Sequence, residues 1–227
     1  MIDPRTIADI LAIDGPAGAG KSTVARRAAG ALGFAFLDSG AMYRAATWNA
    51  MHRGVAWDDA DALASATRAM QLELIEDADG ARVLVDGQDV SRDIRTPEVT
   101  RHIARLDHNP EVRAHLVELQ RAFGARGRTV AEGRDMGTVV FPNAKCKVYL
   151  DASIDERARR RALEFEAKGV AFDASTLRED IRVRDEKDMT RDVAPLRRAD
   201  DAVLLDTSRM TTDDVVAAIV ALARERW

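Results

Sequence analysis

Residues 15–22 read Gly-Pro-Ala-Gly-Ala-Gly-Lys-Ser and match the GxxxxGK[ST] phosphate-binding loop at every fixed position. The apolar run at 10–13, Ile-Leu-Ala-Ile, suits a buried strand before the loop, and residues 22–29 favour a helix after it. When a strand, a glycine-rich turn and a helix follow in this order, successive backbone N–H groups and the helix N-terminus point at one anion. The stretch therefore predicts a site for the phosphates of a nucleotide.

Two side chains of this loop add to its backbone donors. Lys21 can reach the outer phosphates, and the Ser22 hydroxyl can ligate Mg²⁺. Such loops serve GTPase switches, ATPase motors and small kinases. The guanine-reading Asn-Lys-x-Asp of GTPases and the apolar strand ending in Asp-Glu of motors are both absent from the sequence. These absences favour a small kinase.

Four later segments repeat the pattern of an apolar run followed by polar or small residues. Helical patterns lie between most of these runs. Alternating strands and helices indicate a parallel sheet wrapped by helices, with the site beyond the carboxyl ends of the strands. Together with the run at 10–13, they predict an α/β fold with a five-stranded parallel sheet flanked by helices. The four runs are residues 34–37, 129–131, 147–150 and 202–205.

One segment breaks the alternation of strands and helices. Residues 72–75 and 82–85 flank a turn rich in Asp and Gly, which predicts an antiparallel hairpin. Residues 86–89, Asp-Gly-Gln-Asp, predict a further turn. We expect a small β-rich insertion at about residues 65–95, within a single domain that spans residues 1–227.

Composition limits where the protein acts and what it binds. Of its 227 residues, 46% are apolar and 32% are charged, as in soluble globular proteins. No apolar stretch approaches the ~18 residues of a membrane span, and residues 1–5, with an acid and a proline, are unlike a signal peptide. The lone Cys146 excludes an internal disulfide framework, and the net charge of −4 argues against broad nucleic-acid binding. We expect a cytoplasmic monomer without membrane or nucleic-acid partners.

Six stretches, in order along nearly the whole chain, share the pattern of one enzyme family. They are IDGPAGAGKST (13–23), LDSGAMYR (37–44), IRTPEV (94–99), AEGRDMGTVVFP (131–142), YLDAS (149–153) and VAPL (193–196). With them the chain resembles the bacterial cytidylate kinases, of the nucleoside monophosphate kinase family of P-loop kinases. The resemblance implies transfer of the γ-phosphoryl group of ATP to CMP or dCMP, with Mg²⁺. It also implies that residues 39–100, including the insertion, bind the monophosphate, and that residues 155–172 form a helical lid over ATP.

The same resemblance implies which residues contact each substrate. ATP is expected to contact the phosphate loop and two lid arginines, with Ser22 as the metal ligand: Gly15, Pro16, Ala17, Gly18, Ala19, Gly20, Lys21, Ser22, Thr23, Arg157 and Arg161. CMP is expected to contact Ser39, Tyr43, Arg44, Arg113, Arg134, Asp135, Arg184, Asp188 and Arg191. The residues expected to take part in catalysis are Lys21, Arg44, Arg134, Arg184 and Arg191.

The expected reaction suits these residue types. A phosphate monoester is largely dianionic at neutral pH, because its second pKa is about 6, and so it needs no general base. Catalysis then rests on positioning and on positive charge, which guanidinium groups supply well because each can bind two phosphate oxygens. For the base, Asp135 can accept from the cytosine N4 amine and Arg113 can donate to N3 or O2. The chain departs from the family at Ala104, where a serine contacts the base, and the lost polar contact is worth about 1 kcal/mol.

Other interpretations of the same residues stay open. Arg184, Asp188 and Arg191 are spaced four and three apart, so on a helix they share one face, but an ordinary salt-bridged helix has the same pattern. The alternative enzyme is a shikimate-type kinase with a hydroxyl acceptor, in which Asp38 is the carboxylate near that hydroxyl. The alternative of a different class is a nucleotide-dependent regulator that binds ATP and a partner protein without turnover.

Overall fold

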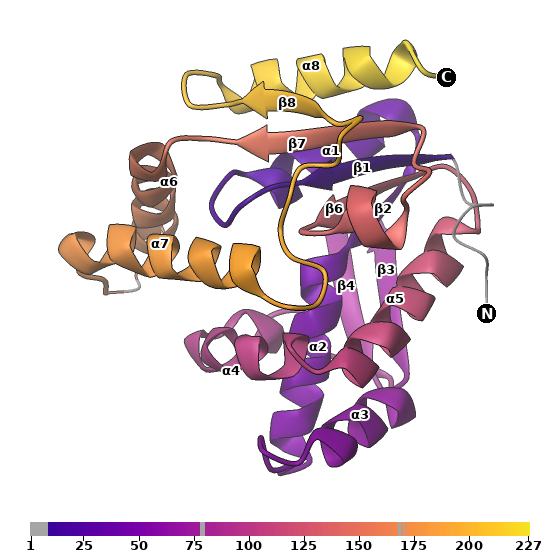
Figure 1. Ribbon diagram of the computed structural model, residues 1–227, viewed down its shortest axis with the longest axis vertical. Helices are drawn as coiled ribbons and strands as arrows, with labels where there is room; N and C mark the ends of the chain where they lie inside the picture. Colours follow the sequence, from indigo (N-terminus) through magenta and orange to yellow (C-terminus); the bar gives the residue numbers. More distant parts are fainter. Residues whose placement is uncertain (1–8, 78–79, 168, 170) are drawn as a thin grey trace. The chain divides into compact units, whose positions relative to one another are not determined.

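A five-stranded sheet in the order β2-β6-β1-β7-β8 follows the prediction (Figure 1). Its central strand, β1 (Ile10–Asp14), pairs in parallel with β6 (Thr129–Gly133) and with β7 (Cys146–Asp151). At the edges, β8 (Val203–Asp206) pairs in parallel with β7, and β2 (Ala35–Asp38) lies beyond β6. Every residue of β1 is buried, as expected for a strand of a parallel sheet covered on both faces. The predicted α/β fold with a five-stranded parallel sheet is confirmed.

The computed structural model describes residues 9–77, 80–167, 169 and 171–227. Residues 1–5, on which the expectation of no signal peptide rests, and Lys168, in the predicted lid, lie outside the described residues. Within the described ranges, no helix is both long enough and apolar enough to cross a membrane.

The chain divides into two compact units. The inserted unit is Leu37–Phe123. The sheet unit combines Gly124–Trp227 with the described part of Asp3–Phe36, and it holds the phosphate loop. Strand β2 is where the chain passes from the sheet unit into the inserted unit.

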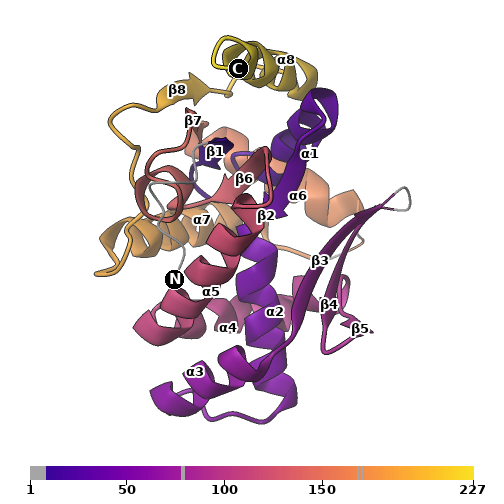
Figure 2. The same ribbon diagram turned by 90° about the vertical axis from the view of Figure 1, so that its right-hand side faces the viewer.

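In the sheet unit, α1 (Lys21–Leu32) and α8 (Thr212–Arg224) lie side by side (Figures 1 and 2). Val24 of α1 and Ile219 of α8 are buried in one apolar cluster with Leu11 of β1. This packing fixes α1 against the central strand. The N-terminus of α1 is thereby held just beyond the carboxyl end of β1, where the phosphate loop lies.

Two further segments follow the carboxyl ends of the central strands, and a third packs against one of them. A π-helical turn, Met136–Val140, comes after β6, and α6 (Ile154–Ala167) comes after β7. Helix α7 (Ala174–Thr190) packs against α6 (Figure 1). Because carboxyl ends of parallel strands meet at one edge of the sheet, these segments gather around the loop between β1 and α1.

In its described part, the inserted unit combines four α-helices and a short 3₁₀ helix, Asp93–Arg95, with a small antiparallel sheet. Helix α2 (Ser39–His52) packs against α4 (Pro97–Asp107) and α3 (Ala60–Ala69), and it also contacts the small sheet (Figure 2). Helix α5 (Pro110–Gly124) follows α4 and contributes the buried Val112 and Leu116 to the apolar core of the unit.

The small sheet contains β3 (Leu72–Asp77), β4 (Gly80–Val85) and β5 (Gln88–Asp89), in that order. The predicted hairpin is therefore confirmed. The prediction of a turn is right for Asp86 and Gly87, whose φ angles are 50° and 80°, but wrong for Gln88 and Asp89. A two-residue turn with both φ positive reverses the chain at once, so the next two residues already pair with β4.

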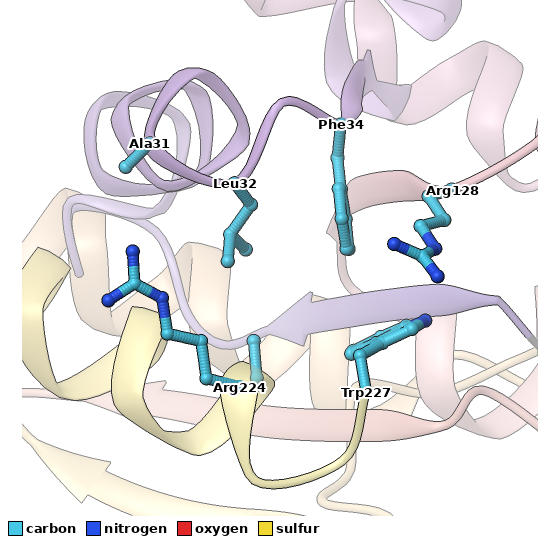
Figure 3. Close-up of a pocket in the computed structure, with 7 residues that line it drawn as sticks. Ala31, Leu32, Phe34, Arg128, Arg224 and Trp227 are labelled. Carbon is cyan, nitrogen blue, oxygen red and sulfur yellow. The ribbon is translucent and has the colours of Figure 1, made fainter.

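A shallow pocket lies at the other end of the sheet unit (Figure 3). The rings of Phe34 and Trp227 meet there edge to face, with centroids 5.1 Å apart, and the Arg128 guanidinium lies 5.8 Å from the Phe34 centroid. Phe34 and Arg128 immediately precede β2 and β6, so the pocket is at the amino ends of these strands. It is separate from the phosphate loop, which follows a carboxyl end.

Candidate active site

The phosphate loop connects β1 to α1 and depends on glycine backbone geometry. Gly18 and Gly20 have φ angles of 77° and 86°, in the left-handed region that favours glycine. A Cβ on Gly15 would lie 2.0 Å from the Leu150 carbonyl oxygen, so no larger residue fits beside β7. The predicted order of strand, loop and helix is confirmed, with Lys21 as the first residue of α1.

Lys21 is buried under the loop that it belongs to. Its Nζ donates a 2.8 Å hydrogen bond to the Pro16 carbonyl oxygen. Burial, with repulsion from the nearby Arg134 and Arg184, lowers the pKa of Lys21 to about 7, although Glu132 opposes the shift. Three basic side chains thus act on one another beside the phosphate loop. A polyanion is the ligand that would relieve their repulsion.

Ser22, the predicted metal ligand, pairs with a carboxylate from a different strand. Its Oγ donates a 2.7 Å hydrogen bond to Oε1 of Glu132, which is buried at the end of β6. A hydroxyl and a carboxylate are oxygen donors of the kind that Mg²⁺ binds together with phosphates and water. Among the described residues, no three His, Cys, Asp or Glu side chains form a metal-binding group. One hydroxyl and one carboxylate fit an ion that takes its other ligands from phosphates and water.

A second buried carboxylate, Asp14, shapes the turn after β6. Its two oxygens accept hydrogen bonds from the backbone N–H groups of Met136, at 2.8 Å, and of Gly137, at 2.7 Å. Burial raises the pKa of Asp14 to about 6, although these two hydrogen bonds oppose the shift. Asp14 thereby fixes the residues that directly follow Asp135, one of the predicted cytosine contacts.

Arg134 and Asp188, both predicted CMP contacts, are brought together by the fold. The Arg134 Nε donates a 2.8 Å hydrogen bond to Oδ2 of Asp188 on α7, and both side chains are mostly buried. Burial would raise the pKa of Asp188, but the charge and hydrogen bond of Arg134, together with the charges of Arg184 and Arg191, outweigh it and the pKa is lowered. Arg184 lies one helical turn before Asp188, and Arg191, just beyond α7, donates to the Ala194 carbonyl oxygen at 2.7 Å.

The remaining predicted CMP contacts lie in the inserted unit. Arg44 on α2 donates to Thr100 Oγ1 at 2.8 Å and to the Ile94 carbonyl oxygen at 3.3 Å. The Arg113 guanidinium on α5 lies 5.5 Å from the centroid of the Tyr43 ring, and Ser39 is the buried first residue of α2.

Asp38, the carboxylate that the alternative kinase requires, has structural partners in the inserted unit. Its Oδ1 accepts from the Ala41 N–H at 2.8 Å and so caps the N-terminus of α2. Its Oδ2 accepts from Arg95 at 3.3 Å. Both oxygens are therefore engaged, which leaves this carboxylate poorly placed to act on an acceptor hydroxyl.

The arginines of the predicted lid differ in their surroundings. Arg157, on α6, is buried and donates to the Ala17 carbonyl oxygen of the phosphate loop at 3.0 Å. Arg160 reaches the Ala19 carbonyl oxygen at 3.3 Å. Arg161 pairs instead with Glu164 within α6 at 2.8 Å. Arg157 and Arg160 thus lie against the loop, whereas Arg161 lies along its own helix.

Comparison with known proteins identifies the family. The family model described as cytidylate kinase matches residues 11–225. The chain belongs to the cytidylate kinase family.

Curated relatives of this cytidylate kinase family member are of two lengths. A cytidylate kinase from Exiguobacterium sp. is 46% identical over 95% of this chain and 96% of the relative. One from Rhodopirellula baltica is 45% identical over 95% of this chain and 93% of the relative. A bifunctional pantoate ligase/cytidylate kinase from Gloeobacter violaceus is 47% identical over 96% of this chain, which spans 43% of that relative. The chain therefore spans less than half the length of its bifunctional relatives.

No role was predicted from the sequence for three acidic residues at the candidate site. Asp14 and Glu132 stand at the ends of β1 and β6, and Asp185 of α7 accepts from Arg157. The sequence did contain a signal for Asp14 and Glu132, because polar residues at the carboxyl ends of parallel strands face the site. The sequence did not indicate the partner of Asp185, which is 28 residues away on another helix.

Proposed function

We propose that this chain transfers the γ-phosphoryl group of ATP to CMP or dCMP, giving ADP and CDP or dCDP. The supporting observation is the cluster of Lys21, Arg134 and Arg184 beside the phosphate loop, where burial and, after it, repulsion from the two arginines lower the pKa of Lys21. A site for one triphosphate needs its loop lysine, whereas a site that joins two polyanions needs further positive charge. Membership of the cytidylate kinase family supports CMP as the second anion.

ATP binds on the phosphate loop in this proposal. Backbone N–H groups that follow Ala17 in the loop hold its phosphates, and Lys21 neutralises the outer ones. Ser22 ligates Mg²⁺, and Glu132 orients the Ser22 hydroxyl through their hydrogen bond. The ion supplies charge neutralisation on the phosphates. Arg161 is assigned to ATP as a lid residue.

CMP is assigned nine residues, which are grouped by the unit that contains each of them. In the inserted unit these are Ser39, Tyr43, Arg44 and Arg113. In the sheet unit they are Arg134, Asp135, Arg184, Asp188 and Arg191. Asp135 and Arg113 read the cytosine edge, and the arginines bind the acceptor phosphate. The acceptor oxygen is already deprotonated at neutral pH, so these residues position and neutralise it and no proton is removed.

An acceptor panel tests this function. ADP release is coupled to NADH oxidation and followed with CMP, dCMP, UMP, AMP, shikimate or no acceptor. We expect CMP and dCMP to give the highest kcat/KM. Turnover only with shikimate would select the hydroxyl kinase, a preference for AMP would contradict the assigned base contacts, and no turnover with any acceptor would favour the regulator. We place the reaction in the cytoplasm and assign it to the monomer, since one chain supplies all the assigned residues.

A further inference from the structure

A buried ion pair joins α6, which lies in the predicted lid, and α7 to the middle of the phosphate loop. The Arg157 Nη1 on α6 lies 2.5 Å from Oδ2 of Asp185 on α7. Both side chains are less than a tenth exposed. The same Nη1 donates to the Ala17 carbonyl oxygen at 3.0 Å, and the Arg157 Nε donates to the Ala152 carbonyl oxygen at 3.0 Å.

Both backbone polar groups of Ala17 are engaged by this pair. Its carbonyl oxygen accepts from Arg157, and its N–H donates to Oδ1 of Asp185 at 3.4 Å. The next residue, Gly18, lies close to Arg157, because a Cβ on Gly18 would lie 3.2 Å from the Cβ of Arg157. The conformation of the loop at Ala17 and Gly18 is thus set by two side chains that lie outside the loop.

We propose that Arg157 and Asp185 are positioning residues for ATP, which act on the phosphates through the Ala17 backbone. This inference rests on the proposed binding of ATP to the phosphate loop. Fixing the Ala17 peptide groups orients the N–H groups that follow it, and preorganised donors bind an anion without the cost of ordering the loop. Arg157 acts through this backbone because its Nη1 and Nε already donate to protein oxygens.

Asp185→Asn separates this role from a direct contact between Arg157 and ATP. If Arg157 binds the phosphates directly, removing the competing carboxylate frees the guanidinium and tightens ATP binding. If the pair positions Ala17, the variant loosens the loop and weakens ATP binding. We expect the Kd for Mg²⁺–AMPPNP, measured by calorimetry without acceptor, to rise about tenfold.

Arg157→Lys is the second variant, because a lysine keeps the charge beside Asp185 but loses the planar arrangement that reaches both Ala17 and Ala152. We expect its Kd for Mg²⁺–AMPPNP to rise by a similar factor, and the KM for CMP to stay within about twofold in both variants. A KM for CMP that rises by the same factor as the Kd for Mg²⁺–AMPPNP would overturn the proposal, since it would indicate general disruption of the fold.

Arg178→Gln is the matched control. Arg178 on α7 pairs with Asp155 on α6 at 2.7 Å, so it bridges the same two helices, but both side chains are exposed and neither contacts the loop. Its Kd for Mg²⁺–AMPPNP should equal that of the wild type. Circular dichroism melting shows that each variant is folded at the assay temperature. An unchanged or lower Kd in Asp185→Asn would overturn the proposal, whereas wild-type protein that binds AMPPNP but does not turn over CMP would contradict only the proposed function.

Discussion

The Ser22 hydroxyl donates a 2.7 Å hydrogen bond to Glu132 across 110 residues of sequence. The register places Glu132 opposite Ile13, directly beside the strand that enters the phosphate loop. Parallel pairing of β1 with β6 therefore brings a carboxylate to the residue that the motif marks as the magnesium ligand. This arrangement gives a first prediction about the metal.

Glu132→Gln keeps the size of the side chain but removes its charge. We expect the Mg²⁺ concentration that gives half-maximal ADP release to rise about tenfold. The reason is that loss of the hydrogen-bond partner of a metal ligand typically lowers metal affinity by about this factor. The measurement is a Mg²⁺ titration at fixed ATP and CMP. Glu179→Gln, at an exposed position on α7, is the control and should behave as the wild type. Identical titrations for Glu132→Gln and the wild type would show that Glu132 has no part in the metal site.

Lys21 should take up a proton when nucleotide binds. Its pKa is about 7 in the free site, mainly because of burial, so at pH 8 most molecules carry the neutral amine. Bound phosphates raise that pKa, and nearly one proton should be taken up for each Mg²⁺–AMPPNP bound at pH 8. Calorimetry in HEPES and in Tris measures this uptake from the difference in buffer ionisation heat. Lys21→Arg stays protonated throughout and should show none; equal heats in both buffers for the wild type would contradict the prediction.

Asp14 should make stability depend on pH. Burial raises its pKa from 3.8 to about 6, so between these values the folded state binds more protons than the unfolded state. The contribution of this group to the unfolding free energy therefore falls as pH rises from 4 to 6 and levels off above that. Asp14→Asn removes this dependence.

Urea unfolding of wild type and Asp14→Asn at pH 4.5 and at pH 7 measures the effect. The variant should gain about 2 kcal/mol relative to the wild type on going from the lower to the higher pH. It should be less active at both, because one amide oxygen cannot replace two carboxylate oxygens that accept from Met136 and Gly137. A stability difference that stays constant with pH would refute the raised pKa.

Base selection should improve when Ala104 is replaced by the serine of the family pattern. A hydroxyl that contacts the base restores a polar contact worth about 1 kcal/mol. Ala104→Ser should therefore raise kcat/KM for CMP about fivefold, with a smaller change for UMP as the internal reference. An equal change for both acceptors would place residue 104 outside base selection.

The sequence was sufficient for the parts of the fold that local patterns encode. The loop at 15–22 has fixed residue types, and the sequence of the fully buried β1 begins with a continuous apolar run at residues 10–13. The turn at Asp86 and Gly87 was harder to place, because the extent of a short strand depends on backbone dihedral angles rather than on hydrophobic pattern.

The site was predicted less completely than the fold. Motifs pointed to Lys21 and Arg134, but the roles of Asp14 and Asp185 depend on partners that are 122 and 168 residues away. Such contacts follow from strand order and helix packing, which a linear pattern does not record. The lid arginines show the same limit, since equal helical spacing gave Arg157 and Arg161 different surroundings.

The fate of the γ-phosphoryl group tests the central claim most directly. Incubating the protein with Mg²⁺, [γ-³²P]ATP and CMP, and separating the nucleotides, shows where the label goes. We predict that label appears in CDP, only when CMP is present, and in an amount equal to the ADP formed. Label found only in inorganic phosphate, or remaining in ATP, would contradict phosphoryl transfer to CMP by this chain.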